Sequence, residues 1–302
     1  MTGKIIVSLD CEGKWGMADV INSSHNAITQ ERLRSTYNDL LKLFSEYNVK
    51  ATFAFVGAFT LRENERSRYL HDEINSTYNG KNWFKNYLLF AKENNSDGWF
   101  CPEAWDMVAE SGHELASHGF SHIPYNEGNA NITDLKEDIE KAVQLSNEKG
   151  HSLKTFVYPR NQVGHQKLLE ANGFLGYREC LKSTKHSRFL SELNIFARSE
   201  GHLEPCHGLT RIPSGHVFNR RSGARGKIPM TITTNRWKSI LLDAIQRNQV
   251  AHLWLHPHNL ITSPSTMLVL RDVIKFIGQQ QHAGKITSFT QLEYTKDRNH
   301  II

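Results

Sequence analysis

The sequence predicts an α/β fold: a single distorted (β/α) barrel in which about seven parallel strands are wrapped by helices and carry long loop insertions. Short apolar runs rich in β-branched residues alternate with longer segments of helical period, which is typical of a parallel sheet covered by helices. About six to eight strands share one core, and no glycine-rich phosphate loop follows any of them. A closed or nearly closed barrel is therefore favoured over an open doubly wound sheet. No linker divides the chain, so we expect one domain over residues 1–302.

The order of the elements follows from apolar spacing, caps and glycine stops. Residues 4–9 form a first buried strand. Thr29 is expected to cap a helix, Thr133 and Asn235 to cap two later ones, and Pro102 to open a fourth. Further strands are expected at 49–56, 113–117, 153–158, 176–178, 250–255 and 285–292, and further helices at 165–171 and 265–281.

Two long segments are expected to be insertions rather than ordinary connections. Residues 60–100 are polar and aromatic without a clear period, and they exceed the usual length of a loop. Residues 182–233 are rich in Gly, Pro, Ser, His and Arg, which indicates loops with little regular structure. Both insertions are expected to shape a substrate cleft.

Charge and composition limit the functional class. The net charge of +5 permits an anionic substrate, and no base-stacking motif or long basic helix indicates a nucleic-acid partner. No apolar run is long enough to span a membrane, and the first strand begins too early for a signal segment. The four cysteines are far apart, as is typical of reduced thiols. We expect a cytoplasmic protein, free or at the inner face of the membrane, of unknown oligomeric state.

Polar residues cluster where the predicted strands end. Strand alternation sends Asp10 and Glu12 to the same side of the first strand, although both could also cap a helix or face solvent. His118 and His122 follow the third strand; on one helical turn their imidazoles would point the same way, and a carboxylate would complete a metal site. Structural roles for these histidines are the alternative. The other strand-end residues are Tyr158, Arg160, Asn161, His256 and His258.

Four stretches of the sequence carry a family resemblance: SLDCEG (8–13), ATFAFVG (51–57), GHELASHGFSH (112–122) and LWLHP (253–257). On these, the chain resembles the polysaccharide deacetylases of carbohydrate esterase family four. The resemblance implies a distorted β/α barrel that removes N-acetyl groups from sugars with a divalent metal. The stretch YPRNQ (158–162) is similar to the version in members encoded with bacterial surface-polysaccharide and O-antigen pathways.

The resemblance also implies roles for residues. Asp10 would be the catalytic base, oriented by Arg160, and His256 the acid that protonates the leaving amine, with His258 as the alternative. Two departures from the family pattern matter: Cys11 separates the two acids and the second acid is a glutamate, so Asp10 and Glu12 could exchange roles, and the arginine motif is shortened. The implied metal ligands are Glu12, His118 and His122, for Zn²⁺ first and Co²⁺, Ni²⁺, Mn²⁺ or Fe²⁺ as alternatives.

Other residues are candidates for binding the substrate. Trp254 shares a strand face with His252 and His256, so it could stack on a sugar ring or fill the barrel core. The basic stretch from Arg220 to Lys227 could hold a pyrophosphate or form a solvated charge run. The expected substrate-binding residues are Trp15, Tyr158, Asn161, Trp254 and His258.

Three functions remain open on the sequence. The first is a metal-dependent N-deacetylase acting on an amino sugar in a polysaccharide, lipid-linked or nucleotide-linked saccharide during surface-polysaccharide biosynthesis. The second is a deformylase or cyclic-amide hydrolase on the same fold. The third is a catalytically inactive carbohydrate-binding relative, which the altered acid pair suggests.

Overall fold

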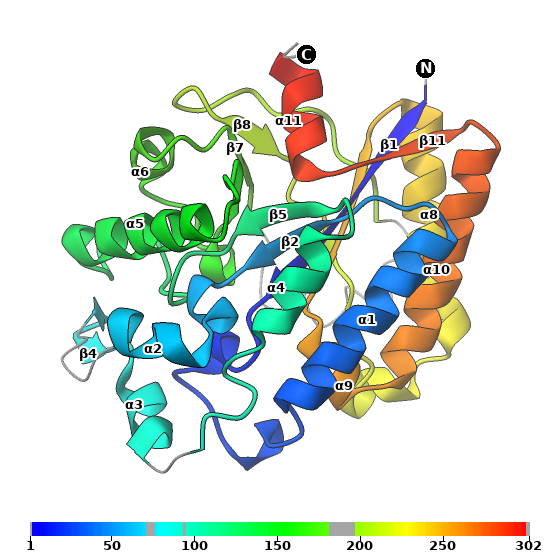
Figure 1. Ribbon diagram of the computed structural model, residues 1–302. Helices are drawn as coiled ribbons and strands as arrows, with labels where there is room; N and C mark the ends of the chain where they lie inside the picture. The colour runs from blue at the N-terminus through cyan, green and yellow to red at the C-terminus, as the bar shows by residue number, and fades with distance from the viewer. Residues whose placement is uncertain (1, 71–75, 93–94, 181–196, 300–302) are drawn as a thin grey trace.

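The computed structural model describes residues 2–70, 76–92, 95–180 and 197–299. Nine strands form one sheet in which every paired neighbour is parallel. Along the main path the order is β8-β7-β6-β5-β2-β1-β10-β9, and β11 pairs with β1 beside it. The sheet curls and is wrapped by helices (Figure 1). The predicted fold class, a distorted (β/α) barrel, is confirmed.

Strand β1 (Gly3–Cys11) is the centre of this sheet. It pairs along one edge with β10 (Val250–Leu255). Along the other edge, its first residues pair with β11 (Ile286–Phe289) and its last with β2 (Thr52–Phe55). A strand enclosed on both edges and both faces must be nearly all apolar. For this reason the run from Ile5 to Leu9 can be recognised as a buried strand in the sequence.

The remaining strands extend the sheet from β2. They are β5 (Glu114–Ser117), β6 (Thr155–Val157), β7 (Gly176–Arg178) and β8 (Thr210–Ile212), and β9 (His216–Val217) lies beyond β10. The strands predicted at 113–117, 153–158, 176–178, 250–255 and 285–292 are therefore present, several with shorter bounds.

The two faces of the sheet have different surroundings. Ile5, Val7 and Leu9 belong to the large apolar core shared with the helices outside. Ile6 instead packs against Ile212, Val250 and Tyr294, an apolar cluster inside the curl. The alternation predicted for β1 therefore separates the outer core from an interior that also receives the side chains of Ser8 and Asp10.

The helices that the sequence predicts begin close to their expected starts, with two exceptions. Thr29 caps α1 as expected, since its side chain accepts a hydrogen bond from the Arg32 amide. Helix α5 is capped by Asn131 rather than Thr133, and α8 begins at Met230 rather than after Asn235. The bounds are α1 (Gln30–Glu46), α4 (Pro102–Ala109), α5 (Ile132–Glu148), α6 (Gln166–Ala171), α8 (Met230–Arg247), α9 (His258–Thr262), α10 (Ser265–His282) and α11 (Gln291–Asn299).

The expectation that residues 60–100 are irregular is wrong, whereas the described part of 182–233 has little regular structure, as expected. The described part of 60–100 contains α2 (Glu63–Tyr69), a hairpin of β3 (Thr77–Tyr78) and β4 (Lys81–Asn82), and α3 (Lys85–Lys92). The segment 182–233 supplies β8 and β9, while residues 181–196 lie outside the described residues. Strands of two residues and helices of seven or eight residues are too short to show a clear period in a sequence, which explains why these elements were missed.

Candidate active site

Three side chains meet beyond the carboxyl ends of β1 and β5. The Glu12 Oε2 atom lies 2.9 Å from His122 Nε2 and 3.3 Å from His118 Nε2, and all three residues are buried. Their ligand atoms lie within 4.8 Å of one another. The structure therefore brings together the three predicted metal ligands, with Glu12 rather than Asp10 against the imidazoles.

The donor set fits a divalent metal. The His118 Nδ1 atom lies 2.7 Å from the Val157 carbonyl oxygen, so Nδ1 carries the proton and donates, leaving the Nε2 lone pair facing Glu12. The Glu12 Oε2 atom is buried without a hydrogen-bond partner among the described residues. Burial opposes ionisation of Glu12, but the neighbouring imidazoles, His122 and His256 foremost, hold its pKa well below its usual value. A charged oxygen and two imidazole nitrogens are ligands that zinc and related ions prefer.

The two histidines do not lie on a helical turn, which corrects the sequence-based expectation. The chain from Ser117 to His122 is an irregular turn, with φ of 75° at Gly119 and 64° at His122. The imidazole centroids are nevertheless only 4.8 Å apart. The direction of the two rings is thus set by this turn and by what supports it.

Asp10 is held by Arg178, a residue that the sequence interpretation missed. The Arg178 guanidinium donates two hydrogen bonds of 2.7 Å, one to each Asp10 carboxylate oxygen, and both side chains are buried. Burial raises the pKa of Asp10, but the charge and hydrogen bonds of Arg178 outweigh it and lower that pKa below the usual value. An arginine at the end of an apolar strand needs a buried anion, and that signal could have identified Arg178 from the sequence.

Arg160, the predicted partner of Asp10, lies elsewhere. Its exposed side chain pairs with Asp19 and lies over the Trp83 ring. The φ of 57° at Arg160 belongs to the tight turn after β6, whereas Arg178 projects from within β7. The orientation predicted for Arg160 is therefore wrong: a side chain leaving that turn reaches Asp19, not the interior.

A second layer of hydrogen bonds supports Arg178. Its guanidinium donates to the Asn161 side-chain oxygen at 2.9 Å and to Ser8 Oγ at 3.2 Å. Ser8 Oγ lies 2.8 Å from His252 Nε2, and His252 Nδ1 lies 2.6 Å from the Pro213 carbonyl oxygen. Burial lowers the pKa of His252 to about 3, so this histidine is neutral and its Nε2 accepts from Ser8. Asn161, predicted to bind substrate, contacts Arg178 in this structure.

His256 and His258 both lie beside the acid pair. His256 Nε2 is 3.6 Å from Glu12 Oε1 and 3.9 Å from Asp10 Oδ2, and its side chain is 25% exposed. His258 Nδ1 is 3.9 Å from Glu12 Oε1, and burial lowers the pKa of His258 to about 3. His256 is therefore the more accessible of the two.

Two of the predicted substrate-binding aromatics lie inside the protein. Trp15 is fully buried and its Nε1 donates to the Trp99 carbonyl oxygen. Tyr158 is also buried, in an aromatic cluster with Tyr125, Phe156 and Tyr177. Neither ring can stack on a bound sugar, so these two predictions are wrong.

Trp254, predicted either to stack on a sugar or to fill the core, lies beside His256 and Arg178. It is half-buried and its ring lies next to His256. The Arg178 guanidinium lies 4.5 Å from the Trp254 ring centroid, so one face of the indole is already covered. Trp254 therefore supports Arg178 as well as bordering the site.

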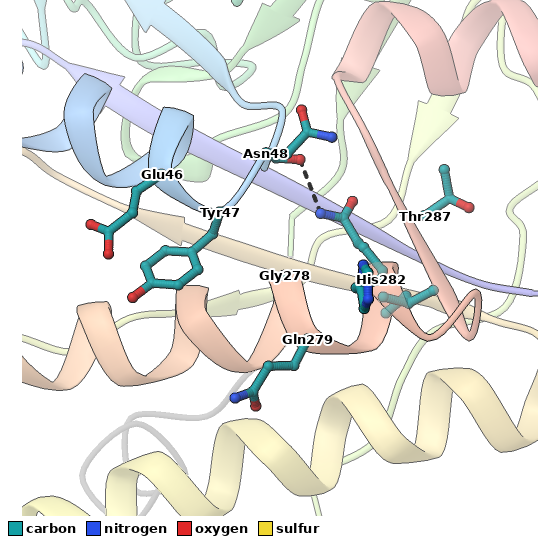
Figure 2. A pocket seen from close by; sticks show the side chains of 9 residues that line it. Glu46, Tyr47, Asn48, Gly278, Gln279, His282 and Thr287 are labelled. Atoms are coloured by element: carbon teal, nitrogen blue, oxygen red, sulfur yellow. Dashed lines mark hydrogen bonds between the residues drawn. The ribbon is translucent and has the colours of Figure 1, made fainter.

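A cavity of about 740 Å³ lies away from this constellation, between the C-terminal ends of α1 and α10. Figure 2 shows Tyr47, Asn48 and His282 around it, and a hydrogen bond joins the Gln281 amide to the Asn48 carbonyl. None of the predicted site residues lines it. The chemistry is therefore better sought at the carboxyl ends of the strands.

Comparisons with known proteins agree on the fold. A family model described as polysaccharide deacetylase matches residues 25–180. The structure of a Mycobacterium smegmatis protein assigned to the polysaccharide deacetylases superposes with a TM-score of 0.62 and 14% identity, over 99% of this chain and 91% of its own. Puue allantoinase reaches 0.60 and 15% identity over 99% and 91%. At these identities, the structural likeness concerns the fold alone. A search of curated proteins finds no match.

No helix within the described ranges has the length and apolar character that a bilayer span requires.

Proposed function

The chain belongs to the polysaccharide deacetylase family, and from that premise we propose that it is a metal-dependent hydrolase that removes an N-acetyl group from an amino sugar. The single observation that carries the proposal is the juxtaposition of two groups. One is the set of metal-type donors on Glu12, His118 and His122, and the other is the ionised Asp10 held by Arg178.

Glu12, His118 and His122 would hold the metal ion, with Zn²⁺ as the first choice and Co²⁺, Ni²⁺, Mn²⁺ or Fe²⁺ as alternatives. When bound there, such an ion would polarise an amide carbonyl and lower the pKa of a bound water to about 7. The proton on His118 Nδ1 is held by the Val157 carbonyl, so the Nε2 lone pair stays available.

Asp10 acts as the general base in this proposal. Arg178 occupies both carboxylate oxygens and keeps Asp10 ionised, so Asp10 can take the proton of the attacking water. Glu12 lies closer to the imidazoles than Asp10 does, which supports the ligand role for Glu12 and the base role for Asp10.

His256 acts as the general acid on the leaving amine. Its Nε2 lies 3.9 Å from Asp10 Oδ2, and its partial exposure leaves the ring within reach of a substrate. His258 is the weaker candidate for this role because its pKa of about 3 keeps it neutral at physiological pH.

The proposed substrate is an N-acetylated saccharide, and the rim of the site favours an anionic one. Arg220 is exposed and makes no salt bridge within the described part of the chain. Its backbone is held between two anchors: the Phe218 amide donates to the Trp254 carbonyl, and the Arg221 amide donates to Thr266 Oγ1. The positive charge of Arg220 also acts on His258. A phosphate or carboxylate on the substrate would compensate this charge.

We further propose a cytoplasmic setting in surface-polysaccharide biosynthesis, with a nucleotide-linked or lipid-linked saccharide as substrate. Cys11 and Cys101 are buried free thiols. Free thiols of this kind fit a reducing compartment.

The decisive experiment is acetate release from a panel of N-acetylated saccharides. Wild-type protein is expected to release acetate, His118→Ala to release none, and His282→Ala, a histidine at the remote cavity, to behave as wild type. Acetate release that survives His118→Ala would exclude the mechanism.

The same panel separates the other candidate activities. The alternatives that the sequence leaves open, a deformylase and a cyclic-amide hydrolase, motivate including N-formyl sugars and cyclic amides among the substrates. Ring-opened product or formate in place of acetate would assign the alternative hydrolase. Stoichiometric metal without hydrolysis of any amide would indicate a binding protein.

A further inference from the structure

A buried carboxylate lies beneath the turn that carries both histidines. Asp138 projects from α5 and is only 4% exposed. It accepts hydrogen bonds from the backbone amides of Phe120 and Ser121, both at 2.8 Å, and from the hydroxyl groups of Ser121 and Tyr125. Both amides belong to the three residues that separate His118 from His122. All four donors are neutral, so this carboxylate is held by hydrogen bonds and not by a cation.

The turn cannot hold this shape through regular secondary structure. Gly119 and His122 both have left-handed backbone angles, which cost energy for a residue with a side chain such as His122. A Cβ atom at Gly119 would lie 2.7 Å from Asp138 Oδ2, so the carboxylate presses directly against the turn.

The opposite side of the turn is held as well. The Gly57 amide donates to the Gly119 carbonyl, and the Ala58 amide donates to the Phe120 carbonyl. The carbonyl groups of the turn therefore bond to the segment after β2, while its amides bond to Asp138. Phe120 and Ser121 are each 1% exposed, so no solvent could replace the carboxylate if it were lost.

We propose that Asp138 is a positioning residue for the metal site: by taking both amides between the two histidines, it aims the imidazoles of His118 and His122 at Glu12. In a helical His-x-x-x-His pair, the helix itself would align the rings. In this protein, hydrogen bonds from the turn to Asp138 align the rings instead of a helix. The inference rests on the proposed function, since it concerns the same metal ligands.

The test is the zinc affinity of metal-free protein, measured by competition with a chromophoric chelator. Asp138→Asn keeps the side-chain volume but leaves one acceptor oxygen where there were two. We expect it to weaken zinc binding by roughly 10- to 100-fold, as loss of a supporting group around a metal site typically does. Amide hydrogen exchange at Phe120 and Ser121 should also become faster in the metal-free variant.

Asp243→Asn is the matched control. Asp243 is also buried, on α8, and it accepts hydrogen bonds from the amide and hydroxyl of Ser199. It is expected to lower the melting temperature without changing zinc affinity. This comparison separates a positioning role from a general loss of stability.

The outcomes are distinguishable. Wild-type affinity in Asp138→Asn would overturn the positioning role and leave the metal site standing. If the wild-type protein binds no zinc, the proposed metal centre is overturned instead. In that case amide exchange still tests Asp138: exchange at Phe120 and Ser121 that is equally slow in wild type and in Asp138→Asn would show that Asp138 does not support the turn. If Asp138→Asn does not fold, Ser121→Ala replaces it, with a smaller loss of affinity expected and an unchanged affinity contradicting the inference.

Discussion

Arg178 and Asp10 form an ion pair joined by two hydrogen bonds of 2.7 Å, with both side chains buried at the carboxyl ends of β7 and β1. These two strands are not neighbours, because β6, β5 and β2 lie between them in the sheet. Only the curl of the sheet brings them face to face. The contact between Arg178 and Asp10 is therefore direct evidence that the sheet curves into a barrel-like shape around the site.

Replacing Arg178 with lysine should reduce turnover strongly. Lysine keeps the charge but lacks the planar pair of nitrogens with which Arg178 donates one hydrogen bond to each carboxylate oxygen, so Asp10 loses its fixed orientation. We expect kcat for acetate release to fall by about 10²- to 10⁴-fold, the usual contribution of a positioned base, with zinc affinity nearly unchanged. Arg160→Lys is the matched control and should retain most activity; a larger loss there than in Arg178→Lys would contradict this assignment.

The two acids should separate by their effects on metal binding. Glu12→Gln is expected to abolish stoichiometric zinc, because Glu12 Oε2 is the carboxylate oxygen that meets both imidazoles. Asp10→Asn should keep the zinc and lose acetate release. Metal content by elemental analysis, measured beside turnover, checks both, and the reverse pattern would exchange the roles of Asp10 and Glu12.

The two histidines after β10 should differ in turnover. His256→Gln removes the accessible imidazole beside Asp10, and we expect kcat to fall by roughly 10²- to 10⁴-fold. His258→Gln should have a smaller effect, since His258 stays neutral with a pKa of about 3. A larger loss of kcat in His258→Gln than in His256→Gln would assign the acid to His258.

Arg220 should control the preference for anionic substrates. Arg220→Ala is expected to raise KM for a pyrophosphate-linked N-acetyl sugar about tenfold at low salt and to leave KM for a neutral N-acetylated oligosaccharide unchanged. Arg298→Ala is the control. Arg298 is exposed on α11, and the first turn of that helix contacts the start of β5, whereas the site lies beyond the carboxyl end of that strand. Equal changes for both substrates would contradict a contact with the anionic group.

Glu114 should make stability depend on pH. This carboxyl is buried at the start of β5 and accepts hydrogen bonds from Thr52, Thr155 and the Leu292 amide. Burial raises its pKa despite these bonds, so the folded state favours the protonated form. Its contribution to stability is therefore complete below the unfolded-state pKa near 4.5 and is lost as the pH rises through the folded-state pKa.

Glu114→Gln removes this titration while keeping the shape of the side chain. Relative to wild type, the variant should gain stability between pH 4.5 and pH 8, by on the order of 1 kcal/mol. Urea unfolding at the two pH values gives the measurement. If the difference in unfolding free energy between the variant and wild type is the same at pH 4.5 and pH 8, Glu114 does not titrate in this range.

Features with a local cause could be predicted from the sequence. The strand around Ile5, Ile6 and Val7 and the helix capped by Thr29 depend on side-chain alternation and on one hydrogen bond to a nearby amide, both of which act over a few residues. Strand-end reasoning placed Asp10, Glu12, His118 and His122 at one edge of the sheet, because residues at the carboxyl ends of parallel strands must share that edge.

Long-range packing decided the rest. The sequence contains several arginines, but which one reaches Asp10 depends on the curl of the sheet across the strands between β7 and β1, and this selects Arg178 over Arg160. Trp15 and Tyr158 looked available to a sugar, yet aromatic neighbours from distant segments enclose them. Local propensity and strand direction could thus be predicted from the sequence. Burial and charge pairing depend on residues far apart in the chain, and only the tertiary structure brings those residues together.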